Sequence, residues 1–193
     1  LKIKSRNILA RSADVTNAAD VQLWVDTVLD KWGRIDIVIN NAGVMRSGKI
    51  HELTVADWDL QYAVNIKGPF LVTKAVLPAM MAQKQGILIY ISSTAALISP
   101  PGNACYASTK WGLDGMTGSF ARELCEYGIK CHTLRPGYVD THLFDADSRP
   151  TNPEIDWIAP EEIANCIEFL CRLPAHAQVP DLNYTTTYQR KKY

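Results

Sequence analysis

The chain has 193 residues, 47% of them hydrophobic and 21% charged, which is the composition of an ordinary globular domain and not of a disordered chain. Twenty Lys and Arg residues balance twenty Asp and Glu residues, so no net field attracts nucleic acid or an anionic membrane. No uncharged apolar run reaches the ~18 residues that a membrane-spanning helix needs. We therefore expect one domain, residues 1–193, with no nucleic-acid partner and no membrane span.

The five cysteines show neither a CxxC pair nor a Cys/His spacing typical of a metal site. Free thiols in a reducing compartment and no bound metal are therefore expected, which favours a cytoplasmic protein. Because the chain begins at Leu1, the sequence leaves open an upstream targeting signal.

Strand-like and helix-like patterns alternate along the chain. The predicted strands, mostly β-branched runs, cover residues 8–13, 35–39, 87–91, 129–134 and 178–186. The predicted helices, marked by apolar stripes and start signals, cover residues 21–29, 54–83, 103–128 and a segment that begins at Pro160. An irregularity is expected in the second helix at Gly68–Pro69, because proline lacks an amide hydrogen. This alternation predicts a parallel sheet covered on both faces, with its ligand at the carboxyl ends of the strands.

Small and polar residues follow the predicted strands, where a ligand is expected. They are Asp14 and Val15 after the first strand, Asn40, Asn41, Ala42 and Gly43 after the second, Ser92 and Ser93 after the third, and the segment 135–141 after the fourth.

Tyr106 and Lys110 are four residues apart in a predicted helix and therefore share one face. A phenol with a pKa of about 10 is a poor acid or base at neutral pH. One ammonium about 4 Å away contributes about 4 kcal/mol at an effective dielectric constant of 20, which brings the phenol pKa toward neutrality. The pattern alone is weak, because Tyr188 and Lys192 repeat it in the basic tail, where we interpret it as coincidence. Only Tyr106 has a serine, Ser93, at a strand end thirteen residues before it.

Five linked motifs resemble the short-chain dehydrogenase/reductase family, in family order and near family spacing, over residues 8 to about 175. They are Asn40–Gly43, Val64–Asn65, Ile91–Ser93, Tyr106-xxx-Lys110 and Pro136–Thr141. The resemblance implies a three-layer, Rossmann-like, doubly wound parallel α/β sheet. It also implies hydride transfer between NAD(P) and a small carbonyl or secondary-alcohol substrate.

The resemblance also implies a role for each residue of the catalytic set. Tyr106 would be the acid/base, and Lys110 would lower its pKa and hold the nicotinamide ribose. Ser93 would bind the substrate oxygen, with Ser92 structural. Asn65 would bend its helix and anchor a water of a proton relay, the alternative being an exposed helix residue.

The implied cofactor contacts come from three strand ends. Asp14 and Val15 would border the adenine, Asn40, Ala42 and Gly43 would line the cleft, and Pro136, Gly137, Val139 and Thr141 would flank the nicotinamide, beside Tyr106 and Lys110. Asp14 has an alternative interpretation as a helix cap, and Asn40–Gly43 as a simple turn. The segment 173–184 resembles a branch with NADP-dependent hydroxy-acid dehydrogenases, so NADP is slightly favoured over NAD.

The chain departs from the family at its beginning. The resemblance implies strand order 3-2-1-4-5-6-7 and a glycine-rich turn after the first strand, yet the first glycine here is Gly33. The chain is therefore expected to lack the first two strands and the turn that holds the pyrophosphate, and to be inactive alone. Residues 1–15 are expected to pair poorly or not at all with the sheet formed by residues 35–186.

Two other functions are open to the same scaffold. One is a non-catalytic NAD(P)-binding or regulatory relative, against which the joint presence of Asn65, Ser93, Tyr106 and Lys110 argues. The other is a nucleotide-sugar epimerase or dehydratase, for which too few residues follow Arg135. A homodimer or homotetramer is expected through the helices 54–83 and 103–127, on the apolar side chains Leu113, Met116, Phe120 and Leu124.

Overall fold

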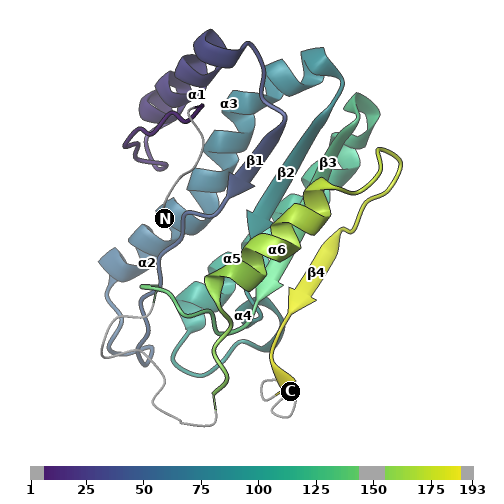
Figure 1. Cartoon of the computed structure of the whole chain (residues 1–193). Coiled ribbons are helices and arrows are strands. Elements are labelled where there is room, and N and C mark those ends of the chain that lie inside the picture. The colour runs from purple at the N-terminus through teal and green to yellow at the C-terminus, as the bar shows by residue number, and fades with distance from the viewer. Residues whose placement is uncertain (1–6, 144–154, 188–193) are drawn as a thin grey trace.

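The computed structural model describes residues 7–143 and 155–187. Its centre is a sheet of four parallel strands in the order β1-β2-β3-β4 (Figure 1). The strands are β1 (Ile37–Asn40), β2 (Gly86–Ile91), β3 (Ile129–Pro136) and β4 (Asp181–Tyr184). The parallel α/β architecture predicted from the sequence is confirmed, and every carboxyl strand end lies at the same edge of the sheet.

Helices cover both faces of this sheet. They are α1 (Ala18–Trp32), α2 (Val55–Tyr62), α3 (Gly68–Gln83), α4 (Ala95–Ile98), α5 (Ala104–Glu123) and α6 (Pro160–Cys171). Residues of α1, α3 and α5 pack against β1, β2 and β3 in the larger core, and α6 crosses the opposite face over β3 and β4 (Figure 1). In the part of the chain that the structure describes, no helix is long and apolar enough to cross a membrane.

Burial in the larger core explains why the sheet is so apolar. Leu88 and Tyr90 of β2 are fully buried between the sheet and the helices, and the Tyr90 hydroxyl lies 2.7 Å from that of Thr73. At the edge strand β1, in contrast, Val38 is buried whereas Ile37 and Ile39 are exposed.

The predicted strand 8–13 is wrong. Residues 7–14 form no strand and lie along α1, where Lys31 Nζ donates to the Ile8 carbonyl at 3.4 Å and Arg11 to the Thr27 hydroxyl at 3.2 Å. A β-prone segment forms a strand only where a neighbour accepts its backbone hydrogen bonds, and no described strand lies beside it. The expectation that this segment does not pair with residues 35–39 agrees with the structure, and residues 1–6 lie outside the described part.

The long predicted helix, residues 54–83, is α2 and α3 joined by a π-helical segment, Ala63–Lys67. The Thr54 side chain accepts from the Asp57 amide, and the Asp57 carboxylate accepts from the Thr54 amide, so the capping box predicted from sequence is present. The irregularity lies just before the predicted Gly68–Pro69. Pro69 has no amide hydrogen for the carbonyl of Asn65, one turn earlier, and the helix widens there.

Candidate active site

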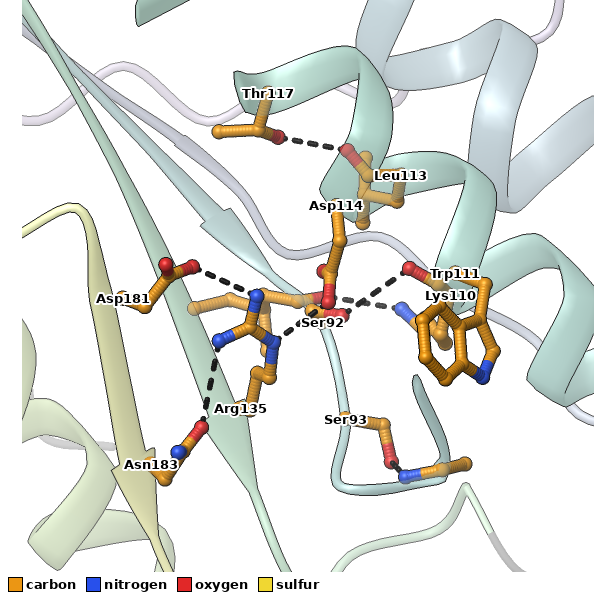
Figure 2. A network of polar contacts seen from close by, with 12 residues as sticks. Ser92, Ser93, Lys110, Trp111, Leu113, Asp114, Thr117, Arg135, Asp181 and Asn183 are labelled. Atoms are coloured by element: carbon orange, nitrogen blue, oxygen red, sulfur yellow. Dashed lines mark hydrogen bonds and ion pairs between the residues drawn. The ribbon is translucent and has the colours of Figure 1, made fainter. Parts of the chain in front are cut away.

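Helix α5 carries Tyr106 and Lys110, and both side chains are buried, with 6% and 4% of their surface exposed. The Lys110 Nζ lies 5.5 Å from the centre of the Tyr106 ring. It donates a 2.9 Å hydrogen bond to the Ile91 carbonyl, the last residue of β2 (Figure 2). Lys110 therefore reaches from the helix to the carboxyl end of the sheet.

Ser93 follows β2 directly and lies beside Tyr106. Its hydroxyl accepts a 3.1 Å hydrogen bond from the Ala95 amide and hydrogen-bonds to the Tyr106 phenol. Ser93, Tyr106 and Lys110 line one cavity of about 800 Å³. The Ser92 hydroxyl instead donates to the Lys110 carbonyl at 3.5 Å, so the two neighbouring serines have different partners (Figure 2).

Burial controls the protonation of this pair. It raises the pKa of Tyr106 to about 12, against the hydrogen bond with Ser93, which lowers it. Burial also lowers the pKa of Lys110 to about 8, against the charge of Asp114, which raises it. The expectation that Lys110 brings the phenol pKa toward neutrality is therefore not met in this structure. Loss of hydration is the largest effect on the phenol, and the Lys110 ammonium donates its hydrogen bond to Ile91 and not to the phenol.

Asn65 is fully buried in the π-helical segment, so its alternative interpretation as an exposed helix residue is wrong. Its Oδ1 accepts from the Val44 amide at 2.9 Å, and its Nδ2 donates to the Val44 carbonyl at 2.9 Å and to Thr109 Oγ1 at 3.1 Å. The Thr109 hydroxyl in turn donates to the Tyr106 carbonyl at 2.7 Å. Asn65 thereby connects the loop that follows β1 to α5, the helix that carries Tyr106.

The predicted cofactor residues divide between two hollows. Those that line the main cavity are Gly43, Tyr106, Lys110, Pro136, Gly137, Val139 and Thr141. Val15, Asn40 and Ala42 line a separate small hollow of about 60 Å³.

Asp14 lines neither hollow, and its carboxylate accepts from the amide and hydroxyl of Thr16, both at 2.8 Å. Asn17 caps α1, so Asp14 is not its cap.

The main cavity fits the nicotinamide end of a dinucleotide. Among its polar groups are the Tyr106 phenol and the Lys110 ammonium, which suit ribose hydroxyls. At Gly43 a Cβ atom would lie 3.8 Å from Lys110 Nζ and 3.6 Å from Asn65 Oδ1, so an alanine would fill space beside the ammonium. The Nδ2 of Asn40 is buried with no hydrogen-bond partner among the described residues, which leaves a donor available near the small hollow.

A charged network behind the site was missed by the sequence reasoning (Figure 2). The Arg135 guanidinium donates to Asp114 at 2.6 Å and pairs with Asp181 at 2.7 Å, and it also reaches Asn183 at 3.5 Å. The sequence contains one indication of this network, because Asp114 follows Lys110 by one turn on the same helix face. No group of His, Cys, Asp and Glu side chains within residues 7–143 and 155–187 is arranged to hold a metal ion.

The family of the chain follows from its match to a family model, described as short chain dehydrogenase, over residues 1–152. The chain belongs to the short-chain dehydrogenase family, in agreement with the fold and with the resemblance of its motifs.

Two curated relatives illustrate the similarity. A 3-oxoacyl-[acyl-carrier-protein] reductase of Synechocystis sp. is 36% identical over 89% of this chain and 71% of its own length. The oxidoreductase UcpA of Escherichia coli O157:H7 is 40% identical over 88% of this chain and 65% of its own length. The chain thus spans about two thirds of the length of these relatives.

Solved structures of the same fold include two with NADP-type ligands. An alcohol dehydrogenase of Thermococcus sibiricus complexed with 5-hydroxy-NADP has a TM-score of 0.85 at 29% identity, over 95% of this chain and 76% of that one. The closed form of a serine dehydrogenase complexed with NADP+ has a TM-score of 0.87 at 26% identity, over 93% and 76%.

Proposed function

We propose that the protein is an NAD(P)-dependent oxidoreductase that moves a hydride between the nicotinamide and a carbonyl or secondary alcohol. The observation that carries this proposal is the meeting of Ser93, Tyr106 and Lys110 at one cavity. A non-catalytic relative on the same scaffold would not need a hydroxyl, a phenol and an ammonium to converge there. The solved relatives that hold NADP-type ligands favour NADP over NAD.

When bound, the nicotinamide supplies or accepts the hydride. The residues of this chain would bind and protonate the substrate. In reduction, the hydroxyls of Ser93 and Tyr106 would hydrogen-bond the carbonyl oxygen, and Tyr106 would donate its proton to it. Because Tyr106 is neutral at pH 7, it holds the proton that this direction requires. Lys110 would stabilise the tyrosinate that remains.

The substrate contacts would come from the segment after β3. Tyr138, His142 and Leu143 line the main cavity, and the Trp157 ring lies 5.8 Å from that of Tyr138. This lining suits a substrate with an apolar or aromatic part next to its carbonyl. Phe144, the next residue of this segment, lies outside the described residues.

The test is Tyr106→Phe in the full-length protein, with Tyr62→Phe as the control. Tyr62 also bears a partly buried hydroxyl, which lies 3.1 Å from that of Ser108, but Tyr62 does not line the cavity. We expect Tyr106→Phe to lower kcat for carbonyl reduction by about 10²-fold or more and to leave the NADPH dissociation constant nearly unchanged. A Tyr106→Phe enzyme that keeps more than a few per cent of the wild-type kcat would refute the assignment.

We further infer that the protein self-associates, through α2, α3 and α5. The side chains on which the sequence-based prediction relied face inward, because Leu113 and Leu124 are buried and Met116 and Phe120 pack against the core. Other apolar side chains of these helices are exposed instead, namely Val55 and Trp58 on α2, Phe70 on α3 and Trp111 on α5. We expect Trp111→Glu to weaken this association. A full-length wild-type protein that sediments as a monomer at tens of micromolar, with no difference from Trp111→Glu, would overturn this inference.

A reducing compartment such as the cytoplasm is supported by the cysteines. All five lie in the described residues as free thiols, and Cys105 and Cys131 are buried. Burial raises the pKa of both thiols, so they are protonated and unreactive at neutral pH.

A further inference from the structure

A line of alternating charges runs from the cavity into the sheet: Lys110, Asp114, Arg135 and Asp181 (Figure 2). Lys110 lines the cavity, and Asp114 follows it by one helical turn on α5. Arg135, on β3, pairs with Asp114 on one side and with Asp181 on the other. Each of the two central side chains is only about a tenth exposed, so solvent screens their interaction weakly.

Arg135 uses only one oxygen of Asp114. Its Nε donates to Oδ2 at 2.6 Å, while Oδ1 is buried and has no hydrogen-bond partner among the described residues. A buried carboxylate oxygen without a hydrogen bond costs free energy unless a nearby positive charge compensates it. Arg135 supplies such a charge through Oδ2, and Lys110, one turn earlier on the same face of α5, is a second buried cation. The charge of the carboxylate raises the pKa of Lys110.

The other neighbours of Lys110 do not compensate its charge. Tyr106, on the same helix, is neutral at pH 7, and the Ile91 carbonyl on β2 offers a dipole only. Among the described residues, Asp114 is the one charged group that shifts the pKa of Lys110, and Arg135 on β3 pairs with that same carboxylate. The charge on a lysine that is 4% exposed therefore depends on Asp114.

We propose that Asp114, oriented by Arg135, is a positioning residue of the acid/base site that keeps the buried Lys110 in its ammonium form. The catalytic part of this assignment rests on the proposed function, whereas the coupling of the two charges does not. A merely structural carboxylate, which only tethers Arg135 to α5, would leave the protonation of Lys110 unchanged when removed.

The test is site-resolved competitive acetylation, because an amine reacts with acetic anhydride only in its neutral form. The labelling of Lys110 is followed against pH by peptide mass spectrometry. In Asp114→Asn we expect the midpoint of Lys110 labelling to fall by about one pH unit, the size of a single close charge. From the wild-type midpoint near 8, the labelling rate at pH 7 then rises about fivefold.

The matched control is Asp181→Asn, which removes a carboxylate from the other side of the same guanidinium. Its Lys110 midpoint should stay at the wild-type value. Arg135→Gln should move the midpoint upward, because it removes the cation that partly neutralises the Asp114 carboxylate, and it carries the test alone if Asp114→Asn does not fold. An unmoved midpoint in Asp114→Asn, an equal shift in Asp181→Asn, or a downward shift in Arg135→Gln overturns the coupling.

The catalytic part is tested separately in the full-length enzyme. The alkaline limb of kcat/KM should move to lower pH with the Lys110 midpoint in Asp114→Asn. A limb that stays in place while the midpoint falls overturns the positioning role. Activity retained by Tyr106→Phe would instead refute the proposed function and leave the measured coupling intact.

Discussion

Replacing Lys110 with methionine should stabilise the protein at neutral pH, by an amount that disappears as the pH rises. Lys110 is 4% exposed, and burial lowers its pKa from 10.5 to about 8. Below pH 8 the lysine is charged in both the folded and the unfolded chain, so the folded state bears the full cost of burying the charge. Between pH 8 and pH 10.5 the folded state loses the proton first, and the cost fades. A shift of this size corresponds to about 3 kcal/mol at 1.36 kcal/mol per unit.

The assay is urea-induced unfolding of the wild type and Lys110→Met at pH 7 and pH 10. At pH 7 the loss of the buried charge should stabilise the variant by up to about 3 kcal/mol. The loss of the 2.9 Å hydrogen bond to the Ile91 carbonyl should offset about 1 kcal/mol of this gain. At pH 10 most of that gap should be gone. The buried cysteines and tyrosines titrate in both proteins, so their contributions cancel in the difference.

The control is Lys74→Met, at an exposed position on α3, for which the gap in stability should not vary with pH. If the difference in free energy of unfolding between Lys110→Met and the wild type is constant or grows between pH 7 and pH 10, the buried ammonium costs the fold nothing. That result would also remove the reason for Lys110 to need Asp114 as a counter-charge.

Three further variants test the backbone and packing of the fold, including the part that holds the site, by chemical denaturation. Gly128→Ala should lower the free energy of unfolding by about 2 kcal/mol or more, because φ is 68° and the new Cβ would lie 2.5 Å from the Lys84 carbonyl oxygen. In contrast, Gly115→Ala, in the open middle of α5, should stabilise by about 0.5–1 kcal/mol, and equal effects at the two glycines would contradict the argument. Asn65→Ala should cost about 2–4 kcal/mol, because it leaves both backbone groups of Val44 without their partner; a loss under 1 kcal/mol would mean that water replaces the amide.

Local patterns predicted the central elements of the fold well. The apolar runs of β2 and β3 and the long helix α5 follow from periodicity, and Thr54 to Asp57 predicted the start of α2 correctly. The segment 8–13 has a strand-like sequence but forms none, because a strand needs a partner that a local pattern cannot supply.

The site was predictable where its residues share one element and unpredictable where two elements meet. Tyr106 and Lys110 are one turn apart, so their proximity can be read from spacing alone. The bond between Asp114 and Arg135 joins residues 21 positions apart and depends on how α5 packs against β3. Likewise, the depth of burial that keeps the Tyr106 proton in place is set by the tertiary structure, and no distance along the chain encodes it.

The π-helical segment between α2 and α3 makes this part of the site sensitive to the insertion or deletion of a single residue. The Gly68 amide bonds to the carbonyl of Ala63, five residues back, so this stretch contains one residue more than an α-helix would. One extra residue rotates everything before it by about 100° relative to everything after it. Asn65 can therefore face Val44 while Val72 and Met80 of the continuing helix face the core. Deleting one residue between positions 63 and 67 would restore a regular helix and turn Asn65 away from Val44, so this part of the site is sensitive to length changes that leave every other residue type intact.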